Sequence, residues 1–330
     1  MTEAAVLVTG GAGYIGSHVV LALLDAGYPV VVLDDLSTGR RDAVAPGAHF
    51  VEGDIGDVRL AAETIGSHGV AAVMHFAGAI VVPESVADPL KYYLQNTCKS
   101  RGLIQVCVEA GVPRFVFSST ASVYGSVGGG PVTESAPAQP ASPYGTSKLM
   151  TEWMLRDAAA AHDLAYAALR YFNVAGADPQ GRSGQSTPGA THLIRVACEV
   201  AAGRRPAMEI FGDDYETPDG TCVRDYIHVT DLAEAHLAAL RDLEARGRNL
   251  TLNCGYGRGY SVRQVLAAVE QAAGFTLEVR IGPRRPGDVA EVVADASRIR
   301  RELGWQPRHD DLDGIVRDAL AWERKLAGGA

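Results

Sequence analysis

A tyrosine and a lysine four residues apart are the strongest candidates for chemistry in this chain. They lie in the segment Ser142–Lys148, which reads SPYGTSK. On a helix this spacing puts Tyr144 and Lys148 on one face, so both side chains can reach the same substrate. A tyrosine with the usual pKa of ~10 is only about 0.1% ionised at pH 7. Tyr144 therefore needs a neighbouring positive charge before it can act as a base.

Lys148 is the first candidate for the source of that charge. Lowering the pKa of a tyrosine by three units takes ~4 kcal/mol. An ammonium ~5 Å away, at an effective dielectric constant of ~20, supplies about 3 kcal/mol of Coulomb attraction. The spacing alone is weak support for catalysis, because a surface tyrosine with an unrelated lysine gives the same pattern.

A glycine-rich turn forms a second candidate site. The segment Thr9–Gly16, TGGAGYIG, follows the apolar run Ala4–Val8 and opens a helical pattern. Its spaced glycines permit a tight turn and a close approach to a pyrophosphate, while the helix N-terminus supplies N–H donors. Asp34 comes roughly 20 residues later, where a carboxylate binds a ribose diol. Because Asp34 would repel a 2′-phosphate, the pattern favours NAD over NADP; the structural alternatives are a strand-end turn and a helix cap.

These residues need a scaffold, and the first half of the chain alternates short apolar runs with helical patterns. Strands are predicted at Val6–Val8, Val30–Leu33, Val70–Phe76, Arg114–Ser118 and Ala165–Leu169, and helices at about 15–26, 89–110 and 144–162. Such alternation predicts an α/β fold, a Rossmann-type doubly wound parallel sheet with helices on both faces.

The alternation ends after Asn173, where a stretch rich in glycine and proline begins. Helices are predicted at about 193–202, from a Ser-x-x-Gln capping box at Ser261 to about Ala273, and at 312–326. We therefore predict an NAD-binding Rossmann domain at 1–173 and a smaller mixed α/β substrate-binding lobe at 174–330. Segments at about 223–255 are expected to return to the first domain.

Composition excludes several classes of protein. The chain has 330 residues, 47% of them apolar, enough for a core in two lobes. A net charge of −9 offers no basic field for nucleic acid or an acidic membrane surface. No segment approaches ~20 consecutive apolar residues, and five widely spaced cysteines argue against disulfides and a thiolate metal site. We expect a soluble cytoplasmic protein without a metal.

The motifs together resemble the extended short-chain dehydrogenase/reductase family and, within it, the UDP-galactose 4-epimerases. The resemblance spans nearly the whole chain and rests on Gly10–Ser17, His75–Gly78, Phe117–Gly125, Ser142–Lys148, Leu169–Asn173, Val223–Val229 and Arg284–Asp288. It implies bound NAD, a UDP-sugar substrate and reversible C4 epimerisation of UDP-galactose and UDP-glucose through a 4-keto sugar. It also implies a homodimer packed through the helices near 89–110 and 144–162.

The resemblance assigns a role to each matching residue near the cofactor. Tyr144, Lys148 and Thr120 are the expected catalytic residues, with Thr120 standing where the family usually has a serine hydroxyl. The expected cofactor-binding residues are Gly10, Gly13, Tyr14, Ile15, Gly16, Asp34, Asp35, Asp54, Ile55, Phe76, Ala77, Gly78, Gln95, Asn96, Tyr144, Lys148 and Phe172. Gln95 and Asn96 replace an Asn-Asn pair, which leaves open the one that contacts the cofactor. Ile80 replaces a common lysine, so one charge-assisted contact is expected to be missing.

The substrate-binding residues follow from the same resemblance. They are Thr120, Tyr144, Asn173, His192, Leu193, Phe211, Arg224, Tyr226, Arg285, Asp288 and Val292. Arg224 and Arg285 are expected to hold the diphosphate, and Asp288 the uridine ribose. Val292 occupies a position that walls the sugar pocket. A bulky tyrosine there restricts the family to plain hexoses, so valine predicts room for a 2-N-acetyl group.

Other functions stay open on the sequence alone. A nucleotide-sugar dehydratase on this fold needs further acid/base groups after Thr120, where such enzymes carry Asp-Glu; Ala121 and Ser122 stand there instead, which favours epimerisation. A non-catalytic NAD-binding regulator would not need the complete Thr120, Tyr144 and Lys148 set. The sugar itself is not fixed, because versions acting on UDP-galactose, UDP-N-acetylglucosamine, UDP-arabinose and UDP-glucuronate share this machinery.

Overall fold

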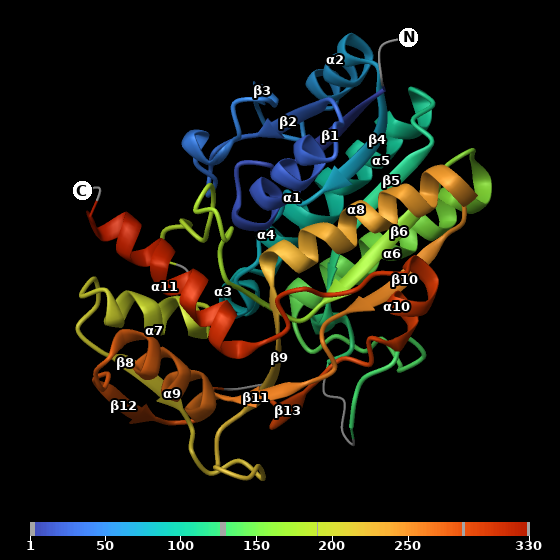
Figure 1. Cartoon of the computed structure of the whole chain (residues 1–330). Coiled ribbons are helices and arrows are strands. Elements are labelled where there is room, and N and C mark those ends of the chain that lie inside the picture. Colours follow the sequence, from blue (N-terminus) through green and yellow to red (C-terminus); the bar gives the residue numbers. More distant parts are fainter. Residues whose placement is uncertain (1–3, 126–129, 190, 286–287, 329–330) are drawn as a thin grey trace.

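A seven-stranded parallel sheet forms the larger lobe (Figure 1) of the computed structural model, which describes residues 4–125, 130–189, 191–285 and 288–328. The strands are β1 (Ala5–Thr9), β2 (Val30–Asp34), β3 (His49–Glu52), β4 (Val70–His75), β5 (Arg114–Thr120), β6 (Ala165–Tyr171) and β10 (Leu250–Cys254). They lie in the order β10-β6-β5-β4-β1-β2-β3, and each neighbouring pair is parallel. The predicted Rossmann-type doubly wound sheet is confirmed.

Helices cover both faces of this sheet. On one face lie α1 (Tyr14–Asp25) and α8 (Val229–Arg246); on the other lie α2 (Val58–His68), α5 (Lys99–Glu109) and α6 (Pro143–Ala161). All residues of β1 and β2 are buried. A strand covered on both faces carries a nearly continuous apolar run, which explains why the sequence does not alternate there.

The second lobe is built from short strands and three packed helices (Figure 1). A mixed sheet contains β7 (Asn173–Ala175), β9 (Val223–His228), β11 (Gly259–Ser261) and β13 (Glu291–Val292), and β8 (Met208–Phe211) pairs with β12 (Val279–Gly282). The helices are α7 (Leu193–Ala201), α9 (Val262–Ala273) and α11 (Leu312–Gly328); α10 (Ser297–Leu303) lies against β10. All three predicted helices form, and Ser261 makes the predicted capping box with Gln264. The chain returns to the larger lobe with α8 and β10 after β9 has joined the small sheet.

The helix expected over residues 89–110 is interrupted. It consists of α4 (Pro89–Tyr92), a π-helical turn η2 (Tyr93–Cys98) and α5. The wider turn carries Asn96, whose buried amide accepts from the Ala79 N–H and donates to the Ala79 carbonyl. A π turn inserts an extra residue into the helical repeat, and the prediction of one continuous helix did not include it.

The remaining short helices are α3 (Val82–Ala87), η1 (Arg41–Ala43) and η3 (Ala121–Val123). Among the described residues, no helix combines the length and the apolar character that a bilayer crossing requires.

Candidate active site

The three predicted catalytic residues lie where β5 ends and α6 begins. Thr120 is the last residue of β5, and Tyr144 and Lys148 lie in the first turns of α6. Ser142 caps this helix by accepting from the Gly145 N–H at 3.2 Å, and Pro143 is its first residue. Thr120 is 7% exposed, Tyr144 7% and Lys148 3%. The Tyr–Lys pair is therefore buried, which excludes the surface-helix alternative.

Lys148 is held beside the last residues of β5 by backbone and aromatic contacts. Its Nζ donates to the Ser118 carbonyl at 3.0 Å and lies 5.0 Å from the centre of the Phe117 ring. Burial lowers the pKa of Lys148 to about 8. The ammonium is thus mostly charged at pH 7 but releases its proton far more readily than a surface lysine.

The protein surroundings of Tyr144 oppose ionisation of its phenol. Burial raises the pKa of Tyr144, and a hydrogen bond with the Thr120 hydroxyl opposes this with a smaller effect. The Tyr92 and Tyr144 rings form a T-shaped pair, with 6.4 Å between ring centroids and an 88° angle between ring planes. Burial is the dominant influence on the phenol, so activation of Tyr144 requires positive charge beyond that expected from the four-residue spacing. Nothing in the sequence pattern singled out Tyr92.

The glycine turn forms a cradle that a side chain would fill. Gly10 has a φ of +72°, and a Cβ on it would lie 2.5 Å from the backbone nitrogen of Ala77. A Cβ on Gly16 would lie 2.1 Å from the Gly10 carbonyl oxygen. Gly13 is the N-cap of α1 and has no side chain to accept from the first-turn N–H groups. Those N–H groups are left to bind an anion, so the turn fits a dinucleotide pyrophosphate.

Asp34 is fixed beside this cradle by two backbone donors. Its Oδ2 accepts from the Ala12 N–H and its Oδ1 from the Leu36 N–H, both at 2.9 Å. Leu36 has a φ of +57°, in the left-handed region that leucine rarely adopts, so the chain turns sharply there. Asp35 is exposed and accepts from Ser37. The carboxylate of Asp34 therefore sits where the fold presents an acid to a ribose diol.

The other predicted cofactor residues follow the carboxyl ends of the strands, where ligands of such sheets bind. Tyr14 and Ile15 follow β1, Asp54 and Ile55 follow β3, Phe76, Ala77 and Gly78 follow β4, and Phe172 follows β6.

Two details refine this set. Asn96 lies against the turn after β4, because a Cβ added to Gly78 would lie 2.7 Å from Asn96 Oδ1. Gln95, the other residue of the pair, is partly exposed. Asp54 forms an ion pair with Lys99 at 2.6 Å. No motif in the sequence marks Lys99, which was not predicted.

Four predicted substrate residues form one cluster in the second lobe. Asp288 faces both arginines: its Oδ1 is 3.7 Å from Arg224 Nη2 and its Oδ2 is 3.1 Å from Arg285 Nε. The Arg285 guanidinium lies 4.6 Å from the centre of the Phe211 ring. Two guanidinium groups sharing one carboxylate keep donors for a doubly charged ligand. Residues 286 and 287, between Arg285 and Asp288, lie outside the described residues.

The remaining substrate candidates line neighbouring elements. Asn173 and Tyr226 are register partners on β7 and β9. His192 is the exposed N-cap of α7, and Leu193 is the first residue of that helix. Val292 packs against a cluster of Val123, Tyr124, Val132, Leu149, Phe172 and Ala294. The predicted pocket wall thus shares a cluster with Phe172, a predicted cofactor residue.

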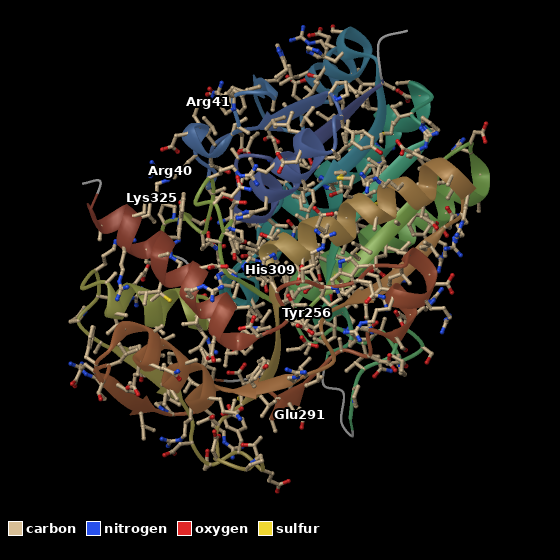
Figure 2. The ribbon with its side chains drawn as sticks, viewed as in Figure 1. Arg40, Arg41, Tyr256, Glu291, His309 and Lys325 are labelled. Carbon is tan, nitrogen blue, oxygen red and sulfur yellow. The ribbon has the colours of Figure 1, made fainter. Side chains whose placement is uncertain are left out.

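A separate polar cluster joins His228, His309 and Asp318, whose possible ligand atoms lie within 4.8 Å of one another. His309 lies beside Tyr256, which donates to its carbonyl at 3.1 Å (Figure 2). His228 Nδ1 accepts from the Thr230 N–H, so the neutral ring carries its proton on Nε2, 3.3 Å from Asp318 Oδ2. A metal would need that nitrogen unprotonated. The geometry therefore describes a helix cap and a histidine–carboxylate pair.

Comparison with known proteins defines the class of this chain. Residues 6–255 match the model of the NAD dependent epimerase/dehydratase family, so the chain belongs to this family. The UDP-glucose 4-epimerase of Azospirillum brasilense is 60% identical over 321 residues, covering 97% of this chain and 92% of the relative.

Solved structures agree with that result. The UDP-glucose 4-epimerase of Brucella ovis in complex with NAD has 44% identity and a TM-score of 0.95, covering 98% of this chain and 99% of that one. The enzyme of Stenotrophomonas maltophila, with bound NAD and formylated UDP-arabinopyranose, has 43% identity and a TM-score of 0.96, covering 99% and 100%. The predicted family and the NAD cofactor are thereby confirmed.

Proposed function

We propose that this chain is a UDP-glucose 4-epimerase, which inverts C4 of UDP-galactose and UDP-glucose reversibly with bound NAD. The observation that carries the proposal is the buried set of Thr120, Tyr144 and Lys148 beside a cradle that fits a dinucleotide. Relatives that match the chain over nearly its full length are epimerases of this kind. A regulator that only bound NAD would have no need of this set.

In the proposed reaction, Tyr144 removes the proton of the sugar 4-hydroxyl and later returns it. Thr120, the last residue of β5, hydrogen-bonds the same oxygen and orients it toward Tyr144. Bound NAD supplies the two-electron oxidation of C4 and its reversal, so no external oxidant is consumed. Lys148, with a pKa of about 8, carries its charge at pH 7 and favours the phenolate.

The two faces of C4 must become accessible in turn. We assign Arg224 and Arg285 to the diphosphate, so that the 4-keto sugar turns about the glycosyl-phosphate linkage while its nucleotide stays bound. Asp288 would then exchange its arginine contacts for the uridine ribose. In this division residues 1–173 hold the cofactor, 174–330 hold the nucleotide sugar, and 223–255 serve both.

The test is direct. Purified protein should carry NAD and interconvert UDP-galactose and UDP-glucose without added oxidant, measured by chromatography of the products. UDP-arabinose, UDP-glucuronate and UDP-N-acetylglucosamine are tested in parallel to define the sugar. Stoichiometric consumption of added NAD would instead mark a dehydrogenase, and loss of water from the sugar would mark a dehydratase.

We also propose a homodimer. Helices α3, α4, η2 and α6 pack together. Together with the two residues before α3, they carry apolar side chains that are each at least 40% exposed: Ile80, Val81, Val82, Val86, Leu90, Leu94 and Trp153. A second copy covering this surface would remove it from water. Light scattering should report a dimer at micromolar concentration.

All five cysteines are free thiols, which supports a reducing cytoplasmic location.

A further inference from the structure

A buried polar chain begins on the catalytic helix, about two turns beyond Tyr144. Glu152 accepts from Arg170 Nε at 2.9 Å and Nη2 at 2.6 Å, and also from the Ser119 hydroxyl. The side chains of Arg170 and Glu152 are 9% and 5% exposed. A buried ion pair is tolerated only where its hydrogen bonds are complete, so these contacts fix α6 against β5 and β6.

From Arg170 the chain continues across the sheet. Arg170 Nη1 donates to the Tyr124 hydroxyl at 3.0 Å, and that hydroxyl donates to Asn253 Oδ1 at 2.6 Å. Ser119, Arg170 and Asn253 are register partners on β5, β6 and β10. One row of the sheet therefore carries the contacts from the catalytic helix to the strand at the sheet edge.

The far end of the chain is fastened to the segment that contains Val292. Asn253 Nδ2 donates to the Val132 carbonyl at 2.7 Å. The Val132 N–H donates to the Val293 carbonyl, and the Asp295 N–H donates to the Val132 carbonyl, both at 2.8 Å. The polar chain thus sets the separation between the catalytic helix and the segment around Val292.

Apolar side chains could fill this space, but they would not define one position as sharply. Buried polar groups tolerate little displacement, because a broken contact leaves a donor or acceptor unpaired without water. Tyr124 also shares a cluster with Phe172 and Val292. A shift along the polar chain would therefore move the packing on which the predicted sugar pocket depends.

We propose that Glu152, Arg170, Tyr124 and Asn253 form a positioning brace that keeps the pocket closed around the 4-keto sugar until C4 is reduced again. This inference rests on the proposed function. Oxidation moves two electrons and one proton from C4 to NAD, and the proton of the 4-hydroxyl to Tyr144. If the 4-keto sugar leaves at that point, NADH remains on the protein and turnover stops. The brace would suppress this loss.

Tyr124→Phe tests the brace by removing one oxygen from its middle while leaving the ring beneath Arg170. We expect the variant to retain NAD and, during turnover of UDP-galactose, to accumulate the fluorescence of reduced nicotinamide about 10-fold faster per turnover than the wild type. The pH profile of turnover should stay unchanged, because Tyr144 and Lys148 keep their surroundings. Asn253→Ser breaks the next contact and should give the same signature.

Tyr166→Phe is the matched control, because it removes the same oxygen from a buried tyrosine near the opposite end of β6. Tyr166→Phe should accumulate as much NADH per turnover as the wild type. If NADH accumulates equally per turnover in the wild type, Tyr124→Phe and Asn253→Ser, the proposed brace is refuted. The same holds if the variants are less stable than the wild type but do not accumulate more NADH per turnover. If Tyr124→Phe does not fold, Asn253→Ser decides alone. A wild type that converts no UDP-sugar refutes the proposed function before any variant is compared.

Discussion

The cofactor cradle and the arginine cluster of the second lobe are built in different ways. The cradle consists of backbone: glycines that exclude a Cβ, first-turn N–H groups, and an aspartate held by two backbone donors. The arginine cluster consists of long side chains, and Arg285 is 48% exposed on its side chain while it pairs with Asp288. A backbone site is fully formed before its ligand arrives, whereas ion pairs near the surface exchange partners at little cost. This contrast suits a cofactor that stays and a substrate that leaves.

The largest expected effect comes from filling the backbone cradle. Gly10→Ala should abolish NAD retention and with it activity, because the new Cβ would lie 2.5 Å from the Ala77 nitrogen. Gly111→Ala is the control, since Gly111 has nearly the same φ, +69°, but no atom within 4 Å of the added Cβ. The NAD content of both purified proteins is measured after acid release. Equal retention in the two variants would show that the cradle is not closed by backbone.

Removing the proton acceptor should separate chemistry from both binding sites. Tyr144→Phe is expected to lower kcat at least ~100-fold, because general base catalysis is lost. Cofactor content and KM should change far less than kcat, since the cradle and the arginine cluster keep the main contacts with both ligands. Wild-type turnover in this variant would remove Tyr144 from the mechanism.

Stability of protein stripped of NAD should depend on pH through Lys148. Its folded pKa is about 8, below the unfolded value of 10.5, because of burial. Between these values the unfolded chain binds more protons, so the free energy of unfolding should rise with pH from about 8 to 10.5. Lys148→Met should stabilise the stripped protein by about 2 kcal/mol at pH 7 and lose this advantage near pH 10.5. Urea denaturation between pH 7 and pH 10.5 measures the free energy of unfolding of both proteins. A difference between them that does not change with pH would refute the lowered pKa of Lys148.

Replacing one arginine tests the arginine cluster of the second lobe as the site that binds and releases the substrate. Arg285→Met should raise KM about 10-fold with NAD content unchanged, because one charge-assisted contact to the diphosphate is lost. Its neighbour Arg284 pairs instead with Asp214 and lies over the Tyr215 ring, so Arg284→Met should leave KM unaltered. Equal KM values for the two variants would count against the assignment of Arg285.

The smallest expected effect concerns the sugar. Val has three side-chain heavy atoms and Tyr eight, so we expect the wild type to epimerise UDP-N-acetylglucosamine and Val292→Tyr to lose that activity while keeping UDP-glucose. Overlap in a packed site costs ~1–3 kcal/mol. Rates on both substrates are compared in both proteins. No N-acetyl activity in the wild type, or unchanged activity in the variant, would exclude Val292 as the determinant.

Sequence reasoning recovered the features that depend on local spacing. The glycine turn, five of the seven strands of the large sheet, the helix of Tyr144 and Lys148 and the capping box of Ser261 each follow from a short segment with its own physical rule. Strands β3 and β10 were not predicted. Resemblance to a family supplied the arginine cluster, whose members come from three separate segments of the chain. The π turn at Tyr93–Cys98, the Lys99–Asp54 pair and the Tyr92 contact depend on tertiary packing, which no local pattern encodes. The spacing of Tyr144 and Lys148 indicates a nearby charge but not the extent of burial, which raises the pKa of Tyr144.

The position of β10 has a consequence for the newly synthesised chain. In chain order this strand is the last of the large sheet, and it pairs with β6, which would otherwise lie at the edge of the sheet. Until residues 250–254 leave the ribosome, β6 presents unpaired N–H and carbonyl groups along an apolar strand, and such an edge templates aggregation. A chain truncated before Leu250 should therefore self-associate during expression, even though it contains the glycine turn, Asp34 and the whole of α6.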